Sequence, residues 1–314
     1  MDLQYLNSYK GTWPKPDDFD KYWDRQLDLV NKVQLNYTIS ETKFSKFENI
    51  AYYDLNFKSF DGANIYAKYV KPKTDKKVPA LLYFHGYPGR NRNCFEKSSY
   101  SSIGYAVFAM DFRGQGGLSE DIGGIKGTTV SGHIVAGLDD SLDNMIYRKN
   151  ILDMCILVRI IKELNGIDEN NISCAGGSQG GAFSAMCAAL NPEIKKCIIQ
   201  YPFLSDMKKV YDLNLDLSAY EGIRYYSRWF NTLEANNDYM FNMLSYIDTK
   251  NFADRIKAKV LFAASGVDLI CPIETQYAVY NNINSEKKLL LYRKYAHENM
   301  PDFNEKILEF LLEV

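Results

Sequence analysis

The hydrophobic positions of the chain form short, nearly continuous runs that are separated by more polar segments. Central strands of a parallel sheet have this pattern because both of their faces are covered. The runs are residues 80–84, 105–110, 172–175, 197–200, 260–264 and 288–292. Apolar residues with helical spacing lie between or after several of them, at 151–161, 182–190 and 303–312. Strands and helices therefore alternate, which is typical of an α/β protein with helices on both faces of the sheet.

Two segments near the amino terminus have a different pattern. Residues 50–58 and 63–71 alternate in polarity and flank Phe60-Asp61-Gly62. Asp-Gly readily adopts the positive φ that tight hairpin turns need. The alternation therefore predicts an antiparallel hairpin at one edge of the sheet. Further upstream, residues 13–23 are expected to form a loop and then a capped helix that packs on the body.

Two longer stretches interrupt the alternation. Residues 114–148 are rich in Gly and Asp, and residues 203–257 carry many aromatic side chains between two expected strands. We interpret 203–257 as a helical cap inserted into a single domain that spans residues 1–314. Tyr225, Tyr226, Trp229 and Phe230 of this cap are expected to wall off one side of a functional site.

Composition excludes several classes of protein. Among 314 residues, 46% are hydrophobic, which allows a sizeable core, and no apolar run approaches the roughly 20 residues of a membrane helix. The 37 basic and 39 acidic residues nearly cancel, without a long block of one sign. Neither nucleic acid nor a membrane is therefore expected as a partner. Residues 1–7 lack a basic leader and an apolar segment, so we expect a cytoplasmic protein.

The cysteines and histidines give little reason to expect a metal. The six cysteines include no C-x-x-C pair and lie mostly in apolar segments, so we expect small packed side chains rather than disulfides or a zinc site. The three histidines are His85, His133 and His297. We therefore expect no metal and no bound cofactor.

One motif carries chemistry. Gly176-Gly177-Ser178-Gln179-Gly180 follows an expected central strand and precedes an expected helix, which is the context of a G-x-S-x-G nucleophile elbow. Glycines are needed two residues before and after the serine because bulkier side chains would collide across this sharp turn. The motif predicts Ser178 as a nucleophile. The alternative is a glycine-rich phosphate-binding or purely structural turn.

A serine needs a base, and the base needs an orienting acid. His297 is the only histidine after Ser178 and follows the last expected strand, whereas Asp268 directly follows the penultimate one. The chain order Ser, acid, His fits this kind of site, so we predict Ser178, Asp268 and His297 as a catalytic triad. The alternatives are a surface-loop histidine and an aspartate that caps the helix near Pro272.

The same chemistry needs hydrogen-bond donors for an oxyanion. The backbone N–H of Gln179, directly after the nucleophile, is one candidate. The other is the N–H of Tyr87, in the loop after the first long strand, since the neighbouring Pro88 has no N–H. His85 is expected to brace this loop, and His133 receives no role.

Further motifs are spread along the chain: Arg113-Gly114-Gln115, the elbow at 176–180, His297-Glu298, Pro16 to Trp23 and the segment 268–272. In these motifs the sequence resembles the acetyl xylan esterase and cephalosporin C deacetylase family, carbohydrate esterase family 7, which has the α/β-hydrolase fold. The resemblance covers nearly the whole chain. Arg113 and Gln115 are expected to tie loops together rather than touch substrate.

The resemblance implies the triad and oxyanion donors named above, with no metal or cofactor. It also implies a doughnut-shaped homohexamer and a serine carboxylesterase that removes acetyl groups from small acetylated sugars such as xylooligosaccharides, and from cephalosporin C. Other carboxylesterases and thioesterases of unknown substrate remain an alternative, because the triad recognises only the acyl carbon. A prolyl-oligopeptidase-type peptidase and a non-catalytic binding module also remain open.

Overall fold

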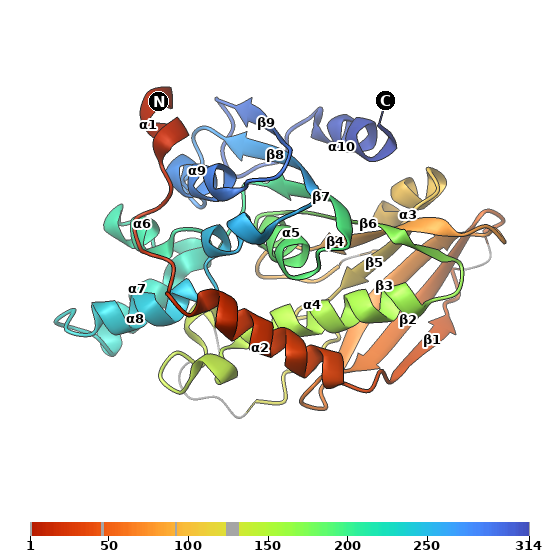
Figure 1. Cartoon of the computed structure of the whole chain (residues 1–314), viewed down its shortest axis with the longest axis horizontal. Helices are drawn as coiled ribbons and strands as arrows, with labels where there is room; N and C mark the ends of the chain where they lie inside the picture. Colours follow the sequence, from red (N-terminus) through yellow and green to blue (C-terminus); the bar gives the residue numbers. More distant parts are fainter. Residues whose placement is uncertain (1, 45–46, 92, 124–131, 314) are drawn as a thin grey trace.

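Nine strands pair into one mixed sheet in the computed structural model, which describes residues 2–44, 47–91, 93–123 and 132–313 (Figure 1). The strands are β1 Tyr37–Glu41, β2 Ile50–Lys58, β3 Asn64–Pro72, β4 Val78–Phe84, β5 Ala106–Met110, β6 Ile167–Gly177, β7 Ile194–Gln200, β8 Lys259–Ser265 and β9 Lys287–Tyr292. Their spatial order is β1-β2-β3-β5-β4-β6-β7-β8-β9. Strands β4 to β9 pair in parallel, while β1, β2 and β3 form an antiparallel edge that joins β5.

This sheet confirms the expected α/β-hydrolase architecture. The predicted hairpin is present as β2 and β3, and Gly62 in its turn has φ +88°. Five of the six predicted apolar runs lie within strands, and the sixth, 105–110, begins one residue before β5. Strand β1 was not predicted, because its side chains are half-buried or exposed and leave no hydrophobic alternation along the chain.

The helices lie on both faces of the sheet (Figure 1). They are α1 Leu3–Ser8, α2 Phe19–Lys32, α3 Phe95–Ser102, α4 Ile146–Glu163, α5 Gln179–Leu190, α6 Met207–Asp212, α7 Glu221–Trp229, α8 Asn237–Ser245, α9 Ile273–Asn282 and α10 Phe303–Leu312. Alternate strand residues face two separate cores. Leu82 belongs to the core under α4 and α5, whereas Leu81 belongs to the core under α3 and α10.

Some local expectations need correction. Asp18 stands at the start of α2 but does not cap it; its carboxylate instead accepts a hydrogen bond from the Tyr246 hydroxyl. Helix α5 begins at Gln179, three residues before its apolar pattern does, because the turn at Ser178 leads straight into it. All six cysteines are free. No helix in the described ranges is long and apolar enough to cross a bilayer.

The insertion between β7 and β8 contains α6, α7 and α8 and packs on the segment around residues 132–145. An added Cβ at Gly222 would lie 2.8 Å from the Cα of Gly132, so the two backbones approach too closely for larger residues. The Tyr226 hydroxyl donates to Asp139 over 2.6 Å. Four aromatic residues of the insertion are expected to wall off the acyl side of Ser178, but of these only Tyr226 is buried. The other three are 43–69% exposed, namely Tyr225, Trp229 and Phe230.

Arg113 links the hairpin turn to α4 from a fully buried position. Its guanidinium contacts Asp153 at 2.5 and 2.8 Å and Asp61 at 2.6 and 3.0 Å. Asp153 is also fully buried and accepts a hydrogen bond from Ser59. Burial raises the pKa of Asp153, and the arginine charge opposes this rise. The buried carboxylate of Asp153 is therefore stabilised in its charged form by Arg113.

We predict that Arg113→Ala lowers the free energy of unfolding by about 3–5 kcal/mol, because it removes the charge partner of the buried Asp153 carboxylate. Arg113→Lys should lose part of this amount, since an ammonium cannot make the same fork of bonds. Urea denaturation checks both values. A loss below about 1 kcal/mol for the alanine variant would show that the pair is not structurally important.

Candidate active site

The turn between β6 and α5 places Ser178 in an unusual backbone conformation. Ser178 has φ +57° and ψ −120°, which a residue with a side chain rarely adopts and which costs on the order of 1–3 kcal/mol. A Cβ at Gly176 would lie 2.5 Å from the backbone of Gly180, and a Cβ at Gly180 would lie 2.2 Å from the carbonyl oxygen of Phe84. Both glycines are therefore required sterically, as the motif predicts.

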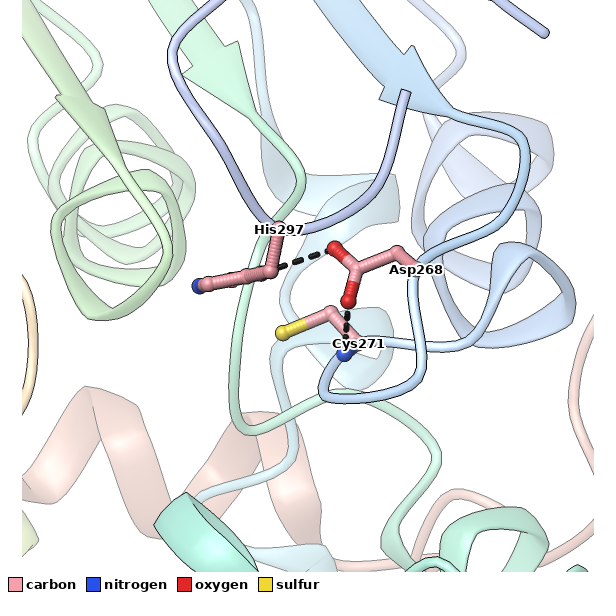
Figure 2. Close-up of side chains that lie close together, drawn as sticks. All are labelled: Asp268, Cys271 and His297. Carbon is pink, nitrogen blue, oxygen red and sulfur yellow. Dashed lines mark hydrogen bonds and ion pairs between the residues drawn. The ribbon is translucent and has the colours of Figure 1, made fainter. Parts of the chain in front are cut away.

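Ser178, His297 and Asp268 lie together at the carboxyl ends of the parallel strands. The Nε2 atom of His297 is 3.0 Å from Oγ of Ser178, and its Nδ1 is 2.7 Å from Oδ2 of Asp268. Asp268 follows β8 and His297 follows β9, so two neighbouring strands deliver the acid and the base. Figure 2 shows the imidazole edge pointing at the carboxylate. Nδ1–H donates to Asp268, which leaves Nε2 free to accept the serine proton.

Backbone donors hold Asp268 in place. Its Oδ1 accepts the N–H groups of Ile270 and Cys271 over 2.8 and 2.9 Å. The side chain of Asp268 is fully buried, and that of His297 is 19% exposed. Burial, together with the charge of Asp268, raises the pKa of the buried Cys271 thiol well above its usual value. The site thus combines a buried acid and thiol with a base that solvent can reach.

The loop after β4, which carries Tyr87, is braced by His85. Nδ1–H of His85 donates to the carbonyl of Gly86 over 2.9 Å, and Nε2 accepts the N–H of Phe112 over 3.1 Å. This pairing fits a neutral ring, and burial lowers the pKa of His85 accordingly. His85 therefore ties the loop to the end of β5 and has no hydrogen bond to Ser178.

His133 supports the same loop, a role that sequence reasoning missed. Its Nε2–H donates to the carbonyl of Gly114 over 2.8 Å, and its Nδ1 accepts the Tyr87 hydroxyl over 3.0 Å. The Tyr87 ring stacks on Phe203, with centroids 5.7 Å apart. The sequence signal was weak, because His133 lies in a glycine-rich stretch with no recognisable spacing to Tyr87.

The Gln179 side chain anchors the residue after the nucleophile. It forms a reciprocal amide pair with Gln115, with two hydrogen bonds of 2.9 Å, and accepts a third from the Tyr147 hydroxyl over 2.9 Å. Gln179 is fully buried. The Arg113-Gly114-Gln115 segment thus fixes the position of Gln179, whose backbone N–H stands at the first turn of α5.

A strained loop after β7 packs behind the nucleophile. The N–H of Phe203 donates to the carbonyl of Ser178 over 3.0 Å. The loop's non-glycine residues with positive φ are Tyr201, Leu204 and Asp206. The ring of Tyr201 also lies 4.6 Å from that of His297. Such a loop needs external support, because each left-handed residue is unfavourable by itself.

Two buried aspartates and the amino-terminal arm supply this support. Asp206 accepts hydrogen bonds from the Tyr9 hydroxyl and from the N–H of Thr12, the latter over 2.9 Å. Asp248 accepts the N–H of Asp206 over 2.9 Å. Burial raises the pKa of Asp248, which reflects how little solvent reaches it. Residues nearly 200 positions before the loop therefore hold it against the site.

The whole chain is similar to known proteins. A family model described as acetyl xylan esterase (AXE1) matches residues 1–314. The acetyl esterase Axe7A of Xylanibacter ruminicola is 30% identical over 284 residues, which cover 88% of this chain; the chain spans 62% of that relative's length.

Two solved structures are similar over their full length. Acetyl xylan esterase 1 from Thermoanaerobacterium sp. JW/SL YS485 is 44% identical with a TM-score of 0.97, covering 100% of this chain and 98% of its own. The acetyl xylan esterase from Paenibacillus sp. R4 is 29% identical with a TM-score of 0.95, covering 100% and 99%.

We predict that Asp268→Asn slows labelling of Ser178 by a fluorophosphonate roughly 10³–10⁴-fold, because the amide no longer holds the imidazole in the tautomer that accepts the serine proton. Labelling rates measured by intact mass give the comparison. Asp254→Asn is the control, since that side chain is 45% exposed and pairs with Lys15 at the surface. Equal effects of the two substitutions would show that Asp268 is not the acid that orients His297.

Proposed function

The chain belongs to the acetyl xylan esterase family, and on that premise we propose that it is a serine carboxylesterase that removes acetyl groups from small acetylated sugars such as xylooligosaccharides. The observation that carries the proposal is the continuous hydrogen-bond chain from Oγ of Ser178 through His297 to Asp268. Among the residues that the structure describes, His297 is the base within hydrogen-bond distance of Ser178.

In the first half-reaction, Nε2 of His297 takes the serine proton while Oγ attacks the acetyl carbonyl. Asp268 stabilises the imidazolium that forms. The backbone N–H groups of Gln179 and Tyr87 are assigned to the negative oxygen of the tetrahedral intermediate. His297 then gives its proton to the departing alcohol oxygen, which leaves an acetyl group on Ser178.

In the second half-reaction, His297 takes a proton from water as the water attacks the acetyl-serine. The tetrahedral intermediate collapses, His297 returns the proton to Oγ, and acetate leaves. The protein groups end in their starting state. No step needs a metal or cofactor, because the imidazole and the backbone donors supply both the proton transfer and the charge stabilisation.

The surroundings of the nucleophile favour a small acyl group. Ser178 itself is only 9% exposed, and Phe203 and Cys271 next to it are fully buried. We therefore assign the restriction on acyl length to these packed neighbours rather than to the largely exposed aromatic residues of α7. We expect polar loops to bound the alcohol side and the site to accept acetyl esters of unrelated alcohols, cephalosporin C included.

We predict that kcat/KM falls at least about tenfold from acetate to butyrate esters, because an extra methylene gains only about 1 kcal/mol in an open pocket and must here displace packed side chains. p-Nitrophenyl esters of increasing acyl length, acetylated xylooligosaccharides and cephalosporin C provide the profile. Ser178→Ala should lower kcat roughly 10⁴–10⁶-fold and controls for non-enzymatic hydrolysis. Rates that rise towards hexanoate would favour another carboxylesterase or a thioesterase.

We further propose a homohexamer, in which the helical insertion acts both as a cap and as a subunit contact. The support is a set of exposed large apolar side chains on this insertion, such as Trp229 at 69% and Leu233 at 89% exposure. Aromatic residues give large contact area at subunit interfaces.

Analytical ultracentrifugation tests the assembly at micromolar concentration. We predict a species about six times the 36.1 kDa mass of the chain, and Trp229→Glu should shift the distribution towards smaller species because it places a charge in an apolar contact. Ile39→Glu, at an exposed position on the edge strand β1, is the matched control. A single 36.1 kDa species would contradict the assembly.

A further inference from the structure

Three side chains with different ligand atoms meet beside the nucleophile. Asp268, Cys271 and His297 each offer one ligand atom, and these atoms all lie within 4.8 Å of one another. Figure 2 shows the Cys271 thiol next to the Asp268 and His297 pair. The esterase steps use the aspartate and the histidine for proton transfer, whereas Cys271 contributes only its bulk beside Ser178. The thiol group itself is therefore available for a further role.

The local backbone brings these three side chains together. The carboxylate of Asp268 binds the N–H groups of Ile270 and Cys271, so the chain turns tightly and brings the cysteine back beneath the acid. His297 reaches the same point from the loop after β9. Two of the three side chains are fully buried, while the histidine keeps one partly exposed edge as a path from solvent.

A carboxylate oxygen, an imidazole nitrogen and a thiolate sulfur are the ligands of zinc, with bonds of about 2.0–2.3 Å. Ligand atoms of a tetrahedral zinc site lie about 3.3–3.8 Å apart at these bond lengths. The most distant of the three atoms would therefore need to close by about 1 Å, and Nδ1 of His297 and Oδ2 of Asp268, now 2.7 Å apart, would need to separate slightly if both bind the ion. Magnesium and calcium do not fit, because they require six or more oxygen ligands and avoid sulfur. The fourth position would face Ser178 and hold water.

We propose that Asp268, Cys271 and His297 form an inhibitory site for Zn²⁺, in which the ion binds the acid and base of the triad together with the thiol. The inhibition, though not the binding, rests on the proposed esterase function. In this account the protein is active without metal and is switched off reversibly when zinc is present.

The proton balance explains the inhibition. Binding expels the Cys271 thiol proton to solvent, so one proton is released for each ion bound. If zinc occupies Nδ1 of His297, the single proton of the neutral ring moves to Nε2, which can then no longer accept the serine proton. If zinc occupies Nε2, it blocks that atom directly. Either coordination removes the general base.

The binding test is a titration of zinc against a chromophoric chelator, which needs no enzymatic activity. We expect one tight site in the wild-type protein, at least about tenfold weaker binding by Cys271→Ser, and unchanged binding by Cys94→Ser, the matched cysteine control in a partly exposed position outside the site. Binding that is unchanged in Cys271→Ser would overturn the proposal.

A spectroscopic test covers the case in which Cys271→Ser does not fold. Cobalt(II) added to the wild-type protein should produce a thiolate-to-cobalt charge-transfer band in the near ultraviolet, and excess zinc should abolish it. A cobalt complex without this band would show that no thiol is a ligand and would refute the site.

The activity test compares each protein with itself, with and without zinc. Zinc at ten times its measured Kd should lower wild-type hydrolysis of an acetate ester about tenfold, and a chelator should restore it. Cys271→Ser at the same concentration should keep most of its own zinc-free rate. Binding without any esterase activity would contradict the proposed function alone, whereas hydrolysis that zinc leaves unchanged would contradict the inhibitory site alone.

Discussion

The turn at Ser178 is the constraint on which the rest of the structure depends. A residue with a side chain holds φ +57° there, between two glycines whose missing side chains let β6, α5 and β4 approach within contact distance. The conformation is unfavourable locally, so the surrounding packing must hold it. In return, the serine oxygen projects from the sheet to the point where the loops after β8 and β9 deliver Asp268 and His297.

The supports of this turn come from distant parts of the chain. Gln115 fixes Gln179 by a pair of amide hydrogen bonds, and His133 fixes Tyr87. The amino-terminal arm holds the strained loop behind the serine through Asp206. The amide pair is buried and the other two contacts are partly buried, which favours a single arrangement of the donors and the base. The site is therefore a product of the whole fold rather than of one motif.

Much of this was predictable because it depends on local patterns. Six apolar runs and a hairpin turn predicted the sheet, and the elbow, with only one histidine after it, led to Ser178, Asp268 and His297, which the structure brings together. Other features depend on contacts between segments far apart in sequence. The edge strand β1 has no hydrophobic alternation, His133 has no fixed spacing to Tyr87, and the closeness of Cys271 to His297 follows from two turns that no periodicity reveals.

In the proposed reaction, Ser178 carries the acetyl group between two half-reactions. Rapid acid quenching of the protein with an excess of an activated acetate ester, followed by peptide mass spectrometry, tests it most directly. The account predicts one acetyl group on the peptide that contains Ser178, formed within a single turnover and lost on further incubation. An acetyl group on another residue would contradict this. So would turnover without any acetylated peptide when deacetylation is slowed, because water would then attack the ester directly.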